Sequence, residues 1–360
     1  MEAHGTSELA AKYARIRPHF DDFAARLERL MKDLLAENRI DIIQIESRAK
    51  EVDSFERKIE QKGTRYADPI AEMTDLAGVR IITYYLEDGD EVEALIRREF
   101  VVDEKNSADK SVLLDPDRFG YLSRHFIVSV ASPRADLSEW ARYAGLKAEV
   151  QVRTALQHAW AAVNHKLEYK SQDDVPRDLK RGLGRLSALF EIADSQFSQF
   201  RSDRERVSEA YGSAVESGDY SLALDLSSLD EYLERSSSVS QLRREIDAVG
   251  QILLDEDPKE DFDKSNILAM LRVLGMTTVA DLDVLINQYA NDRVLLEMVR
   301  DLGTPRKPVT LEAFLVNLFH LANPIVDEHI SFNYEADFDI SNDRAELAAR
   351  RAATTAGSAE

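Results

Sequence analysis

The segment AEVQVRT at residues 148–154 alternates apolar and polar side chains, and this alternation constrains the fold more than any other feature of the chain. Successive strand residues point to opposite faces of a sheet, so the pattern predicts a strand whose Val150 and Val152 pack against helices. The side chains of the opposite face are Glu149, Gln151 and Arg153. That face either lines a cleft or meets water, because charged residues are common on an exposed antiparallel face.

The spacing of apolar residues predicts a mixture of helices and strands up to residue 170. We expect strands at 40–46, 78–86, 99–103, 121–131 and 146–154, helices at 7–36, 52–62, 88–99 and 155–170, and a polar loop at 104–119. Helical periodicity dominates from residue 177 onwards. The expected fold class is therefore α+β: a mixed five-stranded sheet flanked by helices, followed by an all-α C-terminal region.

Composition and periodicity also predict how the chain is divided. We expect an N-terminal helix at 1–39 that packs on a mixed domain at 40–175, a helical extension at 176–235, a helical C-terminal domain at 236–335 and a flexible tail at 336–360. Serine and acidic residues at 226–239 predict a linker or turn region.

The chain of 360 residues has a formal net charge of −21 and contains no cysteine. A disulfide framework, a thiolate metal site and a cysteine nucleophile are therefore excluded. Residues 216–360 contain 28 acidic and 13 basic residues, so the chain should not attract nucleic acid through its overall field. Basic residues that bind phosphates are therefore expected in the first half of the chain. The start of the chain lacks a signal-peptide pattern and no apolar run is long enough for a membrane span, which favours a cytoplasmic location.

The stretch DLAGVRI at residues 75–81 offers a second candidate for chemistry. Asp75 precedes a predicted strand, Gly78 permits a close approach, and Arg80 points off the strand. Oxygen ligands such as an Asp carboxylate suit a hard cation like Mg²⁺. The alternative is an Asp that caps a turn and an Arg on a solvated face.

Two further stretches carry polar residues in a regular pattern. In RFGYLSRHF, the side chains that share a strand face are Tyr121, Ser123 and His125. An aromatic ring beside a glycine turn suits the stacking of a base, although a surface tyrosine at a strand start is also frequent. In ESRAKEVDSFERKIEQK, the residues that could clamp a triphosphate are Arg48, Lys50, Ser54, Lys58 and Lys62. Acidic residues lie between them, so a solvated helix face is the alternative there.

Taken in order, these stretches form the series R-x-K-x-x-x-S-x-x-x-K, D-L-A-G-x-R, G-Y-x-S-x-H, E-x-Q-x-R-T and H-x-W-A…H-x-x-x-Y-K. Over about residues 40–170 the series closely resembles the synthetase domain of the RelA/SpoT family. The resemblance implies a nucleotidyltransferase-like domain that moves the β,γ-pyrophosphate of ATP onto the 3′-hydroxyl of GTP or GDP. The products of that GTP diphosphokinase reaction are the alarmones guanosine tetra- and pentaphosphate, which mediate the stringent response.

The resemblance also implies a role for each residue. On the ATP side, Arg48 and Arg80 resemble the pair that sandwiches adenine, and the phosphate contacts correspond to Lys50, Ser54 and Lys58. Asp75 and Glu149 correspond to ligands of the Mg²⁺ cofactor, and Glu149 is also the expected base for the acceptor hydroxyl. Tyr121 corresponds to the residue that stacks on the acceptor base. The remaining residues near the acceptor or the reacting centre are Ser123, His125, Gln151, Arg153 and His158.

Two departures from the family pattern fall near the acceptor side. Phe119 stands where many members have Asn, and Asn164 stands where small members often have Glu. One alternative is therefore a toxin-type member, controlled by an antitoxin, that pyrophosphorylates the 3′ end of tRNA or makes adenosine alarmones. Another is a nucleotide-binding sensor without turnover. No His-Asp dipeptide of the family's hydrolase half occurs, so we expect no intrinsic breakdown of the product.

The resemblance does not explain the chain after residue 175. Its amphipathic and apolar helices are consistent with an oligomerisation module, an intramolecular sensing domain, a surface for a protein partner, or simply a second core.

Overall fold

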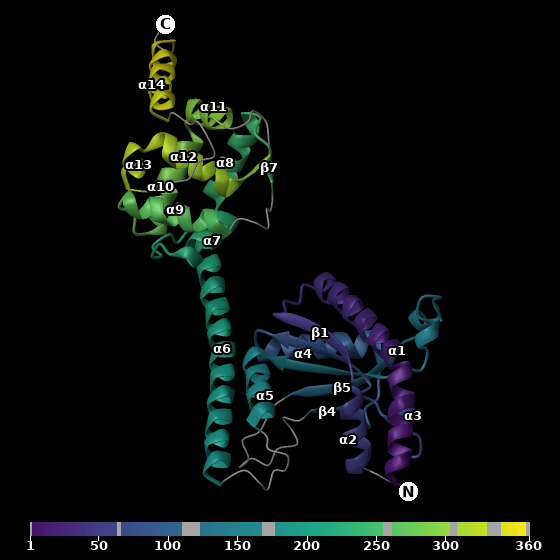
Figure 1. Cartoon of the computed structure of the whole chain (residues 1–360). Helices are drawn as coiled ribbons and strands as arrows, with labels where there is room; N and C mark the ends of the chain where they lie inside the picture. The colour runs from purple at the N-terminus through teal and green to yellow at the C-terminus, as the bar shows by residue number, and fades with distance from the viewer. Residues whose placement is uncertain are drawn as a thin grey trace. The chain divides into compact units, whose positions relative to one another are not determined.

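The computed structural model describes residues 2–62, 66–109, 123–167, 177–254, 261–302, 308–329 and 340–357. The chain forms two compact units, Met1–Arg201 and Ser202–Glu360, and the boundary lies inside the 41-residue helix α6 (Arg177–Ser217) (Figure 1). None of the described helices is both long enough and apolar enough to cross a membrane.

The first unit is built on one mixed sheet. Its strands are β1 (Gln44–Ala49), β2 (Ala77–Thr83), β3 (Phe100–Val102), β4 (Ala108–Asp109), β5 (Arg124–Val130) and β6 (Ala148–Thr154). The strand order is β1-β2-β6-β5-β3, with β4 also paired to β5, and only β2 and β6 run parallel. The predicted α+β class and mixed sheet are confirmed. The short strand β4 lies in the segment that was expected to be only a loop.

The predicted strand at 40–46 starts too early, because β1 begins at Gln44. The isoleucine-rich stretch before it is a connection in which Ile40 and Ile42 are partly buried against the core. The amide of Ile40 still bonds to the carbonyl of Leu35 in the preceding helix, and the chain first bonds to β2 at Ile43, whose amide donates to the carbonyl of Ile82. Apolar content alone therefore misplaced the strand.

The first unit also contains several helices before α6. They are α1 (Glu2–Glu37), α2 (Val52–Lys62), α3 (Pro69–Glu72), α4 (Leu86–Glu99) and α5 (Ala155–Leu167), with short 3₁₀ turns η2 (Arg134–Asp136) and η3 (Ala141–Tyr143). Val150 and Val152 are buried in one cluster with Phe23 of α1 and Val92 of α4. The predicted packing of the valine face against helices is thus confirmed, and the polar face of β6 lies on the other side of the sheet.

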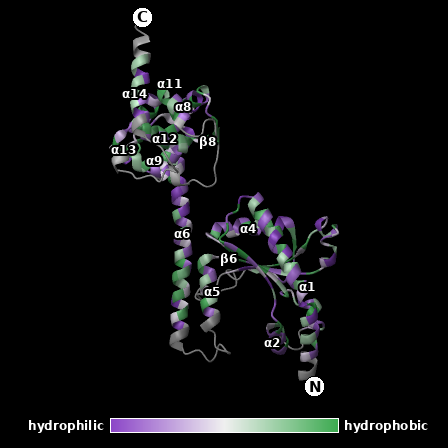
Figure 2. Cartoon of the chain, turned by 45° about the horizontal axis from the view of Figure 1, so that its top comes forward, coloured by the Kyte–Doolittle hydropathy of each residue, from purple (hydrophilic) through white to green (hydrophobic). Residues whose placement is uncertain are grey.

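The second unit is a helical domain with its own core. Its elements are α7 (Leu226–Arg235), α8 (Ser237–Ala248), β7 (Leu253–Leu254), α9 (Asp261–Val273), α10 (Val279–Ala290), α11 (Arg293–Leu302), β8 (Val309–Thr310), α12 (Leu311–Ala322), α13 (Pro324–His329) and α14 (Ile340–Gly357). The centre of the cluster includes Leu229, Leu242, Ile267 and Phe319, all fully buried. Figure 2 shows apolar residues distributed over these helices and along α6.

Two expectations about the second unit are wrong. The stretch 226–239 is helical, because Asp225 caps α7 by accepting from the Ser228 amide and Ser236 caps α8 by accepting from the Ser238 amide. Serine and aspartate favour helix N-caps as well as turns, so composition misled the prediction. The expected flexible tail contains α14, which is anchored by the buried side chain of Leu347.

Candidate active site

Four neighbouring strands bring their polar residues into register on the open face of the sheet. One row across β1, β2, β6 and β5 consists of Glu46, Arg80, Gln151 and His125. The next row consists of Arg48, Gly78, Glu149 and Ile127. Directly paired residues share a face, so side chains that are distant in sequence become neighbours. The sequence segments that carried the motifs therefore meet on one surface.

A cavity of about 430 Å³ lies on this surface. Its lining includes seven of the predicted site residues, namely Arg48, Lys50, Ser54, Asp75, Arg80, Glu149 and Gln151. Gly78 forms part of the floor, where an added Cβ would lie 3.6 Å from the carbonyl oxygen of Glu149. A side chain at this position would fit without a backbone clash but would occupy space in the cavity.

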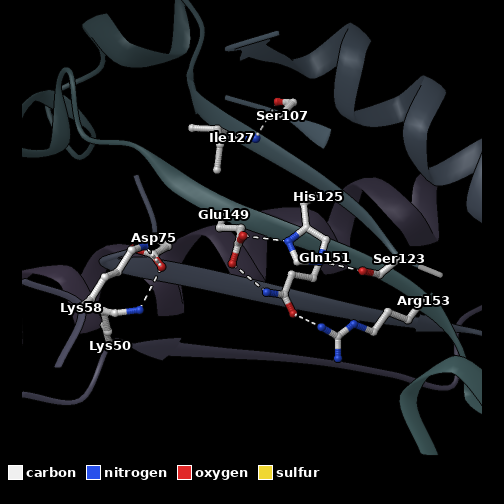
Figure 3. A network of polar contacts seen from close by, with 10 residues as sticks. All are labelled: Lys50, Lys58, Asp75, Ser107, Ser123, His125, Ile127, Glu149, Gln151 and Arg153. Carbon is white, nitrogen blue, oxygen red and sulfur yellow. Dashed lines mark hydrogen bonds and ion pairs between the residues drawn. The ribbon is translucent and has the colours of Figure 1, made fainter. Parts of the chain in front are cut away.

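Asp75 lies between two lysines at one end of the site (Figure 3). Its Oδ2 accepts from Lys50 Nζ at 2.9 Å and from Lys58 Nζ at 2.6 Å. Burial alone would raise the pKa of Asp75, but the two ammonium groups outweigh it and hold the pKa below its usual value. Asp75 is therefore an ionised carboxylate at neutral pH, and its other oxygen is buried and has no hydrogen-bond partner among the described residues.

A chain of hydrogen bonds runs along β5 and β6 from Ser123 to Arg153 (Figure 3). Ser123 Oγ lies 2.7 Å from His125 Nε2, and His125 Nδ1 lies 2.8 Å from Glu149 Oε1. Gln151 donates to Glu149 Oε2 at 2.6 Å and accepts from Arg153 at 2.6 Å. Both carboxylate oxygens of Glu149 are thus held in place. Burial tends to raise the pKa of Glu149, but the bonds from His125 and Gln151 lower it overall.

Positive charge accumulates at the opposite end of the site. Burial, followed by repulsion from Arg80 and Arg48, lowers the pKa of the Arg153 guanidinium to about 9, so it stays charged at neutral pH. Burial and the charges of Arg80 and Arg153 also lower the pKa of His158, which is therefore neutral at pH 7. Arginines that are close enough to repel one another suit a polyanionic ligand, which would relieve that repulsion.

The N-terminal helix supports the cation-bearing strand. Tyr13 Oη donates to the carbonyl oxygen of Lys50 at 2.7 Å, and Arg17 Nε donates to the same oxygen at 3.1 Å. The carboxylate of Asp21 accepts from the amide of Ala49 at 3.2 Å. These contacts hold the end of β1 from which Lys50 projects. Sequence reasoning predicted that the helix packs here but did not identify these residues, because no local pattern marks a contact across more than 25 positions.

A second set of hydrogen bonds stabilises the end of β6. Thr154 and Gln157 form a capping box at the start of α5, and Thr154 Oγ1 also donates to Asp194 of α6 at 2.7 Å. This corner lies between Arg153 and His158 in the chain. Asp194 was missed by sequence reasoning, since nothing around it distinguishes it from the other acids of a charged helix.

Not all predicted residues line the cavity. Ser123, His125 and Arg153 are buried in the hydrogen-bond chain beside it, and Lys58 reaches it through Asp75. Tyr121 and Phe119 lie outside the residues that the structure describes.

The donors on this surface fit a small hard cation. Asp75 and Glu149 are two carboxylates whose charges interact across the cavity, and one oxygen of Asp75 has no hydrogen-bond partner within the part of the chain that the structure describes. Within the described parts of the chain there is no group of three or more potential metal ligands. Mg²⁺ is typically bound by one or two carboxylates, and water and substrate phosphates complete its coordination shell.

Comparison with known proteins agrees with this geometry. Residues 47–174 match the sequence model of a family described as "Region found in RelA / SpoT proteins". Among relatives from Bacillus subtilis (strain 168), the GTP pyrophosphokinase YwaC is 29% identical over 152 residues, which cover 42% of this chain and 69% of that protein. The GTP pyrophosphokinase YjbM is 27% identical over 157 residues, covering 42% of this chain and 70% of that protein.

A solved structure, the small alarmone synthetase 1 from Bacillus subtilis, is 24% identical, covers 54% of this chain and 99% of that chain, and has a TM-score of 0.45. The family match and the two relatives confirm the resemblance that the motif series predicts. Residues 47–174 of this chain are therefore similar to the RelA/SpoT region and to the corresponding part of two GTP pyrophosphokinases.

Proposed function

We propose that the chain is a Mg²⁺-dependent pyrophosphotransferase that moves the β,γ-pyrophosphate of ATP onto the 3′-hydroxyl of GTP or GDP. One observation carries this proposal. A single cavity joins the Lys50–Asp75 cluster to Glu149, whose two carboxylate oxygens are fixed by hydrogen bonds. The relatives named GTP pyrophosphokinases support the same reaction class.

The donor half of the cavity has the groups that ATP requires. Lys50 and Lys58 are ammonium groups within 3 Å of one carboxylate oxygen, and both can turn towards phosphate oxygens. Arg48 and Arg80 lie on paired strands at the cavity wall, where planar guanidinium groups can stack on the adenine ring. The α2 helix buries Phe55, which leaves Ser54 and Lys58 on the side that faces the site.

The acceptor step follows from the position of Glu149. The 3′-oxygen of the acceptor attacks the β-phosphorus of ATP, and the bond from that phosphorus to the oxygen bridging to the α-phosphorus breaks. AMP leaves with that oxygen, and Glu149 takes the proton of the acceptor hydroxyl. The lowered pKa of Glu149 keeps it ionised and able to accept the proton, while His125 and Gln151 fix the direction of the carboxylate.

Asp75 and Glu149 are the residues that would hold Mg²⁺, which would neutralise charge on the transferred group. The chain's own cations contribute to the same task. Arg153 is held beside the cavity by Gln151 and remains charged at neutral pH, so it adds positive potential where phosphate charge develops.

The proposed base is tested by Glu149→Gln. This change keeps the shape of the side chain but removes its ability to take a proton, so kcat should fall by about 10²–10⁴-fold. The matched control is Glu51→Gln, which alters another carboxylate of the same cavity whose side chain is 72% exposed and paired with Arg17. Because an exposed ion pair contributes little, the control should stay within a few-fold of the wild type. Full activity of the Glu149→Gln protein would refute its role as the base.

The acceptor is tested with ATP labelled at the γ-phosphate and Mg²⁺. Separate reactions contain GDP, GTP, ATP alone or deacylated tRNA. Label on a guanosine nucleotide is the expected result. Label only on tRNA or only on an adenosine nucleotide would replace the guanosine reaction by the toxin-type alternative. If the protein binds nucleotides but transfers label to none of these acceptors, it would be a nucleotide-binding sensor and not an enzyme.

A further inference from the structure

Glu46 of β1 is a charged residue of the cavity that the motif series does not include. Its side chain lines the cavity, is 42% exposed and forms an ion pair with Arg80 of the neighbouring strand β2. The two residues are directly paired in the sheet register, so both side chains lie on the open face. Glu46 therefore contacts one of the two arginines that the proposed function assigns to the adenine of ATP.

Glu46 differs from the other carboxylates that line the cavity. Asp75 accepts from two lysines, and both oxygens of Glu149 are bonded to residues of β5 and β6. Glu51 pairs with Arg17 of α1. Among the described residues, Glu46 is thus the one cavity carboxylate that is paired with an arginine of the cavity wall.

This ion pair fixes the plane of the Arg80 guanidinium. Arg80 Nη1 donates to Glu46 Oε1, and hydrogen bonds from a guanidinium lie in its plane. Both faces of the plane therefore stay available for stacking on an aromatic ring. Arg80 Nε is buried and has no hydrogen-bond partner in the described part of the chain, so there the bond to Glu46 is the one that orients the group.

Glu46 also reduces the positive charge at this end of the cavity. Burial, Arg80 and Arg48 lower the pKa of the Arg153 guanidinium, and the charge of Glu46 acts against them. The same charge acts against the lowering of the His158 pKa by burial and the arginines. A carboxylate that acts on all of these groups makes this end less attractive to phosphates, because like charges repel.

The phosphate-binding lysines lie at the other end of the cavity. Glu46 and Lys50 are four residues apart, which corresponds to about 13 Å of extended chain. Lys50 and Lys58 present ammonium groups beside Asp75, whereas Glu46 presents a carboxylate. The base of a nucleoside triphosphate is uncharged and its phosphates are anionic, so the nucleotide has one favoured direction in this cavity.

We propose that Glu46 is a positioning residue that fixes the direction in which the donor nucleotide binds, an inference that rests on the proposed pyrophosphotransferase function. Glu46 holds Arg80 with its plane presented to the base, and it keeps phosphate groups away from the arginine end. It acts through Arg80 and takes no part in the transfer itself.

Calorimetric titration of the full chain with two ligands, in the presence of Mg²⁺, tests this role. α,β-Methylene ATP cannot be cleaved at the bond that the proposed reaction breaks, and tripolyphosphate offers phosphates without a base. Glu46→Ala should weaken binding of the ATP analogue by about 10-fold, because stacking on an oriented guanidinium is lost. Binding of tripolyphosphate should be unchanged or tighter, because a negative charge has been removed. Glu46→Gln can still accept from Arg80 and should restore part of the affinity for the analogue.

Two further variants separate this role from a general loss of structure. Glu51→Ala is the matched control, because it removes a carboxylate of the same cavity that pairs with Arg17 instead of Arg80. Its affinity for the ATP analogue should stay within a few-fold of the wild type. In the Arg80→Ala background, Glu46→Ala should cause no further loss, because the residue through which it acts is absent.

Three results would overturn the positioning role and leave the proposed function intact. They are an unchanged affinity of Glu46→Ala for the ATP analogue, equal losses for the analogue and tripolyphosphate, and a loss that persists in the Arg80→Ala background. A wild-type chain that binds neither ligand would overturn both the positioning role and the proposed function.

Discussion

The hydrogen bond between Thr154 and Asp194 should stabilise the junction of β6 and α5, which lies next to the site. The two side chains are 3% and 5% exposed, and Thr154 Oγ1 donates to Asp194 Oδ2 at 2.7 Å. A hydrogen bond to a charged acceptor contributes about 1.5–3 kcal/mol, and leaving a buried hydroxyl without its acceptor costs about 1–3 kcal/mol. Asp194→Ala should therefore lower the free energy of unfolding of the first unit by about 2 kcal/mol.

Asp194→Asn is the informative companion, because its amide oxygen can still accept from Thr154. Burial raises the pKa of Asp194, and the bond from Thr154 only partly offsets this. The charged form is therefore disfavoured in the folded chain, and the Asn variant removes that penalty while keeping the acceptor. We expect its unfolding free energy at pH 7 to lie within about 1 kcal/mol of the wild type.

The raised pKa also fixes how the stability depends on pH. Between the unfolded value of 3.8 and the higher folded value, the folded chain binds more protons at Asp194 than the unfolded chain does. Stability from this group is therefore greatest below pH 3.8 and falls as pH rises through the folded pKa. The unfolding free energy of the wild type, relative to that of Asp194→Asn, should therefore fall as pH rises through the folded pKa. It should become constant at higher pH.

Urea unfolding monitored by tryptophan fluorescence measures this change. The chain has two tryptophans, Trp140 and Trp160, and both lie in the first unit, so the signal reports that unit alone. A double-mutant cycle of Asp194→Ala and Thr154→Val isolates the pair, with an expected coupling of about 1–2 kcal/mol. Additive effects, with a coupling below about 0.3 kcal/mol, would refute the reasoning.

Three further predictions concern the cation-bearing side of the site. Lys58→Met removes one of two ammonium groups beside Asp75 and should raise the KM for ATP by about 10-fold or more, measured at saturating acceptor. Tyr13→Phe removes one of the two side-chain hydrogen bonds to the Lys50 carbonyl and should raise the KM for ATP several-fold while the KM for the acceptor is unchanged; equal effects on both would contradict a local role. The folded pKa of Asp75 is lowered, so its contribution to stability is complete above the unfolded value of 3.8 and is lost as pH falls through the folded value. Asp75→Asn should therefore reduce the loss of unfolding free energy on the acid side of its pH profile.

Sequence reasoning succeeded where a local pattern reflects a local cause. The alternation at 148–154 predicted both faces of β6, because strand geometry by itself sends neighbouring side chains to opposite sides. It failed where local composition has two physical meanings. Isoleucines at 40–43 suit a strand but belong to a connection in which Ile40 and Ile42 are partly buried and Ile43 is exposed. Serines at 236–238 suit a turn but form the N-cap and the first residues of α8.

The sequence by itself determined which residues could carry the chemistry, because the residue types and spacing of the five motifs depend only on the chain. Tertiary structure decided which of them meet. The antiparallel pairing of β1 and the parallel pairing of β6 with β2 set the register that joins Glu46, Arg80 and Gln151 in one row. It also decided that Tyr13 and Asp194, which no motif marks, support the site, since contacts between residues so far apart exist only once the chain has folded.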